Sequence, residues 1–168
     1  TGLKPHRIAQ MGITRTFQTT TLFNQLRVAD NLAIGYRMRT ASGFWSTIFH
    51  TRRWKEDREK TMARVLEILG FIGMTDKAFD FVSTLSQEEQ KRLSIGVALA
   101  GEPKVILLDE PTGGLIQEDT DGITQLIKKI KAAGITVCLI EHKMNMVMDL
   151  ADRILVLNYG NKLAEGTP

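Results

Sequence analysis

The chain has 168 residues, 43% of them hydrophobic and 24% charged, which is the balance of one ordinary folded domain with its own core. It contains no apolar run of membrane-spanning length. Cys138 is the only cysteine, so an internal disulfide is excluded and a reducing compartment fits; we expect its thiol to pack as a small hydrophobic group. Because the sequence starts at Thr1 without a methionine and stops at Pro168, we expect both ends to be cut.

The net charge of +3 is unevenly distributed. Residues 1–70 hold twelve Lys or Arg against five Asp or Glu, whereas the remainder holds ten against fourteen. The basic excess is densest between Arg37 and Arg64, among several aromatic side chains. Such a patch suits nucleic acid or lipid headgroups, but we favour a solvated helical face because no nucleic-acid-binding motif accompanies the charge.

The amino-terminal half predicts mostly helices. Residues 1–17 predict a short helix and then a strand over residues 12–17, residues 28–40 predict a helix, and residues 41–54 predict a loop. Apolar positions between Arg58 and Leu69 follow helical spacing, and Gly70 is the predicted end of that helix.

A capping pattern marks the start of the next helix. Ser86 is a good N-cap residue, and Glu89 stands three positions later, which is the pattern of a capping box. The helix is predicted to run to Ala100, where Gly101 and Pro103 interrupt it.

The most informative run is Val-Ile-Leu-Leu-Asp-Glu-Pro at residues 105–111. Four apolar residues predict a strand, over residues 104–109, that is buried on both faces and ends at Asp109 and Glu110. A second buried strand, predicted over residues 135–140, ends in the same way at Glu141 and His142. Ligands of open α/β sheets bind beyond the carboxyl ends of the strands, so we expect these polar side chains to meet a nucleotide phosphate, its magnesium ion and a water molecule.

The carboxyl-terminal third alternates helices and strands. A helix ending near Gly134 connects the two buried strands, a short helix is predicted over residues 144–150, a third strand over 153–158 and an edge strand over 161–165. The alternation over residues 104–158 predicts parallel βαβ units with right-handed crossovers.

The order and spacing of several segments resemble the ATP-binding subunits of ABC transporters, most of all those of bacterial branched-chain amino-acid importers, over nearly the whole chain. The segments are Gly12–Gln18 for the Q-loop, Leu85–Gln90 for the signature motif, Val105–Asp109 for the Walker B strand, Glu110 for the catalytic glutamate and Ile140–His142 for the switch histidine. The resemblance implies a P-loop NTPase-like (RecA-like) α/β fold, a parallel sheet core with an inserted α-helical subdomain, truncated at both ends.

Domain organisation and site roles follow from the same resemblance. It implies a partial ATPase core at residues 1–27 and 85–168, and a helical subdomain at 28–84 that contacts a permease. The implied cofactors are ATP and Mg²⁺, with the metal held by Asp109 and Gln18. An aspartate suits Mg²⁺, usually through a water, because this ion prefers oxygen ligands and retains its hydration.

The remaining site residues are assigned in the same way. The resemblance implies that Glu110 orients or deprotonates the attacking water and that His142 donates a hydrogen bond to the γ-phosphate. Nucleotide binding is implied for Gln18, Ser86, Gln90 and Asp109, with Ser86 at a helix N-terminus meeting the nucleotide of the opposite subunit. Taken singly, Gln18 is better explained as a polar loop residue, whereas Ser86 could equally be a simple N-cap, a role compatible with phosphate binding.

The implied partners are a second nucleotide-binding subunit, in a head-to-tail homodimer or heterodimer, and integral membrane permease subunits. The implied location is cytoplasmic and peripheral on the inner face of the cell membrane, and no nucleic-acid partner is expected.

The sequence also departs from the family pattern. No Gly-rich loop ending in Gly-Lys-Ser or Gly-Lys-Thr occurs in it, so we expect this chain alone to be inactive and not to bind ATP tightly. Glu88 stands where the signature motif has glycine, and its carboxylate is expected to face and repel a polyphosphate. Val97 replaces a common arginine, and Ile116 replaces an Asp or Asn.

Three functions therefore remain open from sequence. The first is a fragment of an importer subunit that couples ATP hydrolysis to transport. The second is a nucleotide-silent interaction or scaffold module, favoured by the missing loop and by Glu88 and Ile116. The third is a soluble ABC ATPase that works on DNA or ribosomes, which the basic stretch permits.

Overall fold

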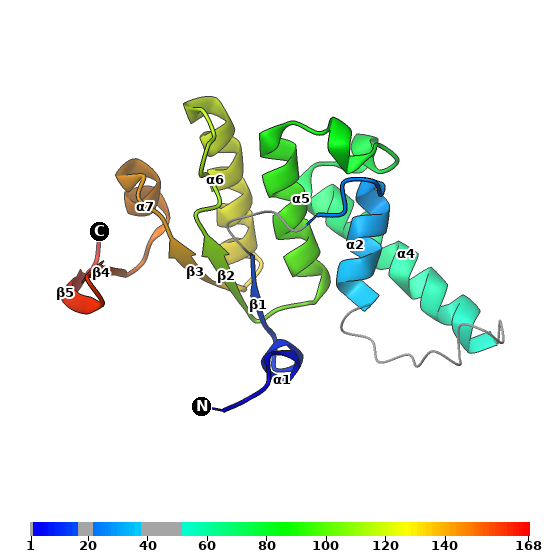
Figure 1. Ribbon diagram of the computed structural model, residues 1–168, viewed down its shortest axis with the longest axis horizontal. Helices are drawn as coiled ribbons and strands as arrows, with labels where there is room; N and C mark the ends of the chain where they lie inside the picture. Colours follow the sequence, from blue (N-terminus) through cyan, green and yellow to red (C-terminus); the bar gives the residue numbers. More distant parts are fainter. Residues whose placement is uncertain (1, 17–21, 38–51) are drawn as a thin grey trace.

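The computed structural model describes residues 2–16, 22–37 and 52–168. Its helices are α1 (Pro5–Gln10), α2 (Val28–Arg37), α4 (Arg52–Ile72), α5 (Gln87–Ala100), α6 (Gln117–Ala132) and α7 (Met144–Leu150), with 3-10 turns at Thr75–Lys77 and Val82–Thr84. Its strands are β1 (Ile13–Arg15), β2 (Val105–Asp109), β3 (Thr136–Ile140), β4 (Ile154–Asn158) and β5 (Asn161–Gly166). A small sheet stands between the helices α2, α4 and α5 on one side and α7 with a hairpin on the other (Figure 1).

The central sheet is parallel, in the order β1-β2-β3. Helix α6 connects β2 to β3, so this predicted βαβ unit is confirmed. Ile106 and Leu108 of β2 are buried in the core, as expected for a central strand. Strand β1 is shorter than the predicted range 12–17, and the end of that range lies outside the described residues.

The predicted third parallel strand is wrong in its pairing. Strand β4 forms where expected, but it pairs antiparallel with β5 in a separate two-stranded sheet. The turn between them, Tyr159 and Gly160, has positive φ at both residues (46° and 79°), the backbone geometry of a tight hairpin turn. This turn lets β4 pair with β5, the strand that follows it directly in the sequence. Figure 1 shows the hairpin beyond α7, away from β3.

Strand β3 is also less buried than predicted. Val137 and Leu139 pack against the core, whereas Thr136, Cys138 and Ile140 alternate with them and are exposed. The expectation that Cys138 lies packed in the interior is therefore wrong. Successive side chains of a strand point to opposite faces, and in the described residues only one face of β3 is covered.

Helix α4 begins earlier and ends later than the sequence predicts. It includes Arg52, inside the predicted loop 41–54, and it continues past Gly70. The residue that ends it is Gly73, whose φ of 72° only glycine adopts freely. Met74 N–H donates to Leu69 O at 2.9 Å, the long hydrogen bond of a Schellman cap. Helix α2 follows prediction to Arg37, and residues 38–40 lie outside the described chain.

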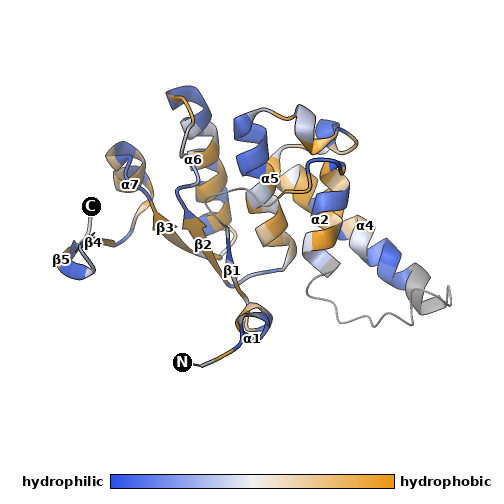
Figure 2. Ribbon diagram, viewed as in Figure 1, coloured by the Kyte–Doolittle hydropathy of each residue, from blue (hydrophilic) through white to orange (hydrophobic). Residues whose placement is uncertain are grey.

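One continuous core connects the helices to the sheet. Buried side chains of α2, α4 and α5 join those of β2 and α6, and Figure 2 shows in orange the apolar stretches that these elements carry. The predicted capping box at Ser86 is confirmed, and α5 runs to Ala100 as expected. Among the described helices, none has the length and apolar character needed to cross a membrane.

Candidate functional site

The acidic end of β2 meets the end of β3 at one open edge of the sheet. Asp109 pairs with Ile140 in register, and Glu110 N–H donates to Ile140 O at 2.9 Å. The His142 imidazole follows directly, with Nδ1 at 3.7 Å from Glu110 Oε1. The three side chains are 21% (Asp109), 34% (Glu110) and 68% (His142) exposed, so they are accessible to a ligand. They share one edge, as the pattern of the two strands predicts.

The backbone at Glu110 turns sharply out of the sheet. Its φ is 44°, in the left-handed region that non-glycine residues rarely adopt. The conformation is held on both sides, because Glu110 N–H donates into β3 and Gly113 N–H donates to Glu110 O at 3.0 Å. Such constrained backbone conformations are common at functional sites. Here the conformation ends β2 at Asp109, so Glu110 lies in the turn that follows the strand.

Asp109 is paired with a cation from the neighbouring strand. Arg15 Nη2 on β1 lies 2.9 Å from Asp109 Oδ2. Nowhere in the described residues do three or more His, Cys, Asp or Glu side chains gather into a metal site. A single carboxylate at a strand end fits Mg²⁺, which takes most of its ligands from water and phosphate oxygens. Gln18, the other predicted metal ligand, lies outside the described residues.

Sequence reasoning missed the role of Glu141, between the exposed Ile140 and His142. Its side chain is 0% exposed. It accepts hydrogen bonds from the N–H and hydroxyl of Thr112 and from the N–H groups of His142 and Lys143. Burial by itself would raise the pKa of the Glu141 carboxyl, but these hydrogen bonds outweigh it and lower that pKa below its ordinary value. Strand alternation is the signal that could have found it, because residues 137, 139 and 141 share the covered face.

Lys143 was missed as well. Its ammonium donates to Thr112 O at 3.2 Å, Leu115 O at 3.0 Å and Thr120 Oγ1 at 2.7 Å. These three bonds join the segment after β3 to the turn after β2 and to the first turns of α6. No local sequence pattern predicts such a contact, because the acceptors lie 23 to 31 residues away along the chain.

Ser86 and Gln90 lie at the start of α5, and their described hydrogen bonds belong to the capping structure of that helix. Ser86 Oγ accepts from Glu89 N–H at 3.2 Å, and Glu89 Oε2 accepts from Ser86 N–H at 2.8 Å. The hydrogen bond from Ser86 N–H, above all, lowers the pKa of Glu89. Gln90 Nε2 donates to Leu85 O at 3.1 Å. The Ser86 hydroxyl keeps its own proton, which it can donate to a phosphate oxygen.

Glu88, the expected source of repulsion, is paired with a cation of its own helix. Its side chain is only 15% exposed, and it accepts hydrogen bonds from Nε and Nη2 of Arg92 one turn later. Arg92 Nη1 also donates to Ile72 O at 3.0 Å. The carboxylate is therefore neutralised within its own helix and turned toward the neighbouring helices, so it does not present a bare negative charge.

The two other residues that depart from the family pattern, Val97 and Ile116, differ in their burial. Val97 is partly buried and packs against the core beside α2. Ile116 is 66% exposed at the N-cap of α6, where it supplies no side-chain cap. Ile116 thus leaves an apolar side chain on the surface at the start of α6.

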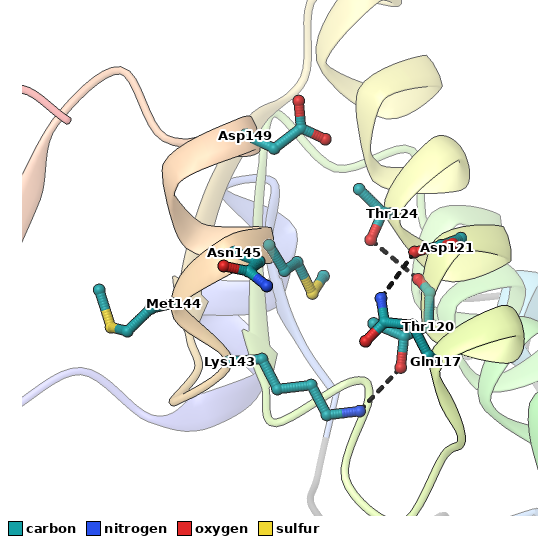
Figure 3. Close-up of a pocket in the computed structure, with 9 residues that line it drawn as sticks. Gln117, Thr120, Asp121, Thr124, Lys143, Met144, Asn145 and Asp149 are labelled. Atoms are coloured by element: carbon teal, nitrogen blue, oxygen red, sulfur yellow. Dashed lines mark hydrogen bonds between the residues drawn. The ribbon is translucent and has the colours of Figure 1, made fainter.

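A cavity of about 580 Å³ lies between α6 and α7 (Figure 3). Its lining includes Gln117, Asp121 and Thr124 of α6 and Asn145, Met146 and Asp149 of α7. Lys143 crosses one wall to reach Thr120, as the dashed line in Figure 3 marks. The lining does not include Asp109, Glu110 or His142, so those residues occupy an open edge and not this cavity.

The fold agrees with the comparison to known families. The sequence profile of the family described as ABC transporter matches residues 3–113. The chain belongs to the ABC transporter family. This ABC transporter chain is 34% identical to the high-affinity branched-chain amino acid transport ATP-binding protein BraF of Pseudomonas aeruginosa, over 99% of the chain and 66% of BraF. The same values hold for LivG of Escherichia coli, a protein with the same description.

Solved structures of the family have the same fold. The ADP conformation of MJ1267, an ATP-binding cassette of an ABC transporter, superposes with a TM-score of 0.83 at 30% identity, covering 100% of this chain and 65% of MJ1267. A dimeric, post-hydrolysis structure of the cassette MJ0796 bound to ADP and Pi gives 0.77 at 25% identity, covering 99% of this chain and 68% of MJ0796. The chain has the P-loop NTPase-like α/β fold of these cassettes, and it spans about two thirds of their length.

Proposed function

We propose that this chain is part of the ATP-binding and ATP-hydrolysing subunit of an ABC importer that takes up amino acids. The observation that carries the proposal is the pairing of β2 with β3, which brings Asp109, Glu110 and His142 to the same edge and sets Glu110 Oε1 3.7 Å from His142 Nδ1. The identity of 34% to branched-chain amino acid transport ATP-binding proteins supports the importer class and the substrate class.

Each side chain at the edge has a chemistry that suits ATP hydrolysis. Asp109 would hold Mg²⁺ through its carboxylate, together with Gln18, and the bound ion would neutralise charge on the phosphate oxygens. Glu110 is half-exposed beside this position and would orient or deprotonate the attacking water. His142 would donate a hydrogen bond to the phosphate oxygen on which charge develops.

The signature residues would act on a second nucleotide. The described hydrogen bonds of Ser86 and Gln90 lie within the start of α5, and their role is proposed to be across a dimer interface. Ser86 would donate its hydroxyl proton to a phosphate held by the opposite subunit, at the N-terminus of α5. The dimeric cassette structure of MJ0796 supports a homodimer or heterodimer of such subunits.

We infer that residues 28–84 form a helical subdomain that contacts the permease, and that 1–27 and 85–168 belong to the ATPase core. Exposed aromatic side chains within residues 28–84 support a partner contact there, since Phe79 is 74% exposed and Phe81 49%. Arg27 lies over the rings of Phe79 and Phe81, at 5.9 and 5.8 Å from their centroids. Two exposed aromatic side chains that share one neighbour suit a protein partner, and a contact with the permease would place the chain at the inner face of the cell membrane.

The second candidate, a nucleotide-silent interaction module, has one observation in its favour. No Gly-rich phosphate-binding loop occurs in the 168 residues, so the backbone cradle for the β- and γ-phosphates has no counterpart in this sequence. Its other support is weaker than the sequence indicated, because Arg92 neutralises Glu88.

The test is a fusion in which the BraF segment that precedes the matched region is joined to Thr1. If the proposal is right, the fusion hydrolyses ATP in the presence of Mg²⁺, Glu110→Gln lowers the rate by at least about a hundredfold, and the chain without the segment binds no ATP analogue at micromolar concentration. A folded fusion that binds ATP and stays inactive, with or without Glu88→Gly, would instead favour the silent module.

A further inference from the structure

The imidazole of His142 is not held in place by hydrogen bonds to the neighbouring carboxylates. The imidazole is 68% exposed, and the nearest carboxylate oxygens, Glu110 Oε1 and Glu141 Oε2, lie 3.7 and 3.6 Å from Nδ1, beyond hydrogen-bond distance. Something else must hold the histidine beside Glu110. The residues on either side of it in the sequence, Glu141 and Lys143, are the ones that make firm contacts.

Glu141 connects the backbone of His142 to the turn after β2. One carboxylate oxygen, Oε1, accepts from the N–H of Thr112 at 3.3 Å and from the Thr112 hydroxyl. The other, Oε2, accepts from the N–H of His142 at 2.9 Å and from that of Lys143 at 3.3 Å. Thr112 is itself fully buried and stands two residues after Glu110, so this carboxylate spans the two loops that carry the candidate catalytic side chains.

Lys143 connects the same loops from the other side. All three of its donors are used, on Thr112 O, Leu115 O and Thr120 Oγ1, at 2.7 to 3.2 Å. Figure 3 shows the side chain lying across the wall of the α6–α7 cavity toward Thr120. Thr112 is therefore held at its N–H and hydroxyl by Glu141 and at its C=O by Lys143.

We propose that Glu141 and Lys143 are positioning residues, which together fix the distance between His142 and Glu110 by anchoring both sides of the histidine to residues 112–120. The inference rests on the proposed function, because the distance matters for catalysis only if this edge hydrolyses a nucleotide. Neither side chain would touch the substrate. Their loss should therefore lower kcat and leave the KM for ATP nearly unchanged, since ground-state binding depends on other groups.

Two variants break one anchor each with little change in volume. Glu141→Gln keeps the shape, but its amide NH₂ replaces one acceptor oxygen and meets N–H donors, so the four bonds cannot all persist. Lys143→Met keeps the aliphatic stem and removes three donors, and Lys143→Arg restores a cation with several donors. Lys131→Met is the matched control, because Lys131 also bonds a backbone carbonyl, Leu150 O, but at the far end of α6.

In the ATPase-active fusion, Glu141→Gln and Lys143→Met should lower kcat by about tenfold or more, because small displacements of catalytic groups have effects of this size. The KM for ATP should change by less than about threefold, and Lys143→Arg should recover most of the rate. Lys131→Met should keep kcat within about twofold of the parent. A Lys143→Met enzyme with parental kcat, or a Lys131→Met enzyme that is equally impaired, would overturn the inference.

A second measurement separates this inference from the proposed function. Amide hydrogen exchange, followed by NMR in the chain itself, reports the N–H groups of Thr112, His142 and Lys143 without any ATP. Glu141→Gln should speed their exchange by at least about tenfold, because it removes their acceptor, while amides of α4 should remain protected. If the parent fusion hydrolyses no ATP, the proposed function fails; if exchange at these three amides is unchanged in Glu141→Gln, the anchoring fails.

Discussion

Two glycines in helices of the same bundle offer a paired test of how closely α2 and α5 approach. A β-carbon on Gly35 of α2 would lie 2.8 Å from Val97 O and 3.0 Å from Val97 Cγ1, so it would overlap the backbone of α5. A β-carbon on Gly70 of α4 would meet nothing within 4 Å. The same substitution to alanine should therefore have opposite effects at the two positions.

The expected magnitudes follow from two competing terms. Glycine to alanine in a helix stabilises by up to about 1 kcal/mol, and Gly70→Ala should show this gain alone. At Gly35 the same gain is opposed by overpacking, which costs about 1–3 kcal/mol because the carbonyl of Val97 cannot move without shifting α5. The unfolding free energy of Gly35→Ala should therefore be lower than that of Gly70→Ala by about 1–3 kcal/mol.

Urea unfolding followed by far-UV circular dichroism measures both variants against the parent. The two variants should differ in Tm by roughly 2–12 °C in a parallel thermal scan. Equal stability of the two variants would contradict the reasoning, because it would mean that α2 and α5 are not in backbone contact at Gly35. The contact also bears on the proposed function, since Ser86, the proposed nucleotide-binding residue, lies at the start of α5.

Three further outcomes are expected. Ser86→Ala should lower the unfolding free energy by about 1 kcal/mol, measured in urea, because it removes the N-cap acceptor of α5, and in the ATPase-active fusion it should also lower kcat. Glu88→Gln should lower the unfolding free energy by about 1 kcal/mol, because it weakens the partly buried bond to Arg92. The same variant should not raise ATPase activity in the fusion, because Arg92 already neutralises the carboxylate. The folded pKa of Glu141 lies below the ordinary 4.5, so its stabilisation is complete above that pH and lost as the pH falls through the lower folded value. The unfolding free energy of Glu141→Gln should accordingly depend less on pH in this acidic range than that of the parent, as urea titrations at a series of pH values would measure.

The pairing of Glu88 changes how the altered signature motif is understood. The residue stands where the family has glycine, and its sequence position alone indicated repulsion of a phosphate. Arg92 stands one helical turn later and satisfies the carboxylate, so the pair is a local stabilising feature of α5. The i, i+4 spacing was visible in the sequence, and it is the signal that would have corrected the expectation.

Several features could be predicted from sequence because their causes are local. The apolar run of β2 and its ending at Asp109 and Glu110 follow from residue type and order, and the capping box at Ser86 follows from a three-residue spacing. The parallel pairing of β2 with β3 follows from the helix between them. These features were sufficient to place His142 beside Glu110.

What only the tertiary structure decided depends on contacts between distant segments. Whether a strand is covered depends on its neighbours, so Cys138 and one face of β3 are exposed although their sequence is apolar. Strand β4 pairs with β5 because a tight turn brings that partner closer than β3. The bonds of Glu141 and Lys143 to Thr112 join residues about 30 positions apart, and a polar group that distant gains its partner only when the sheet and α6 are assembled.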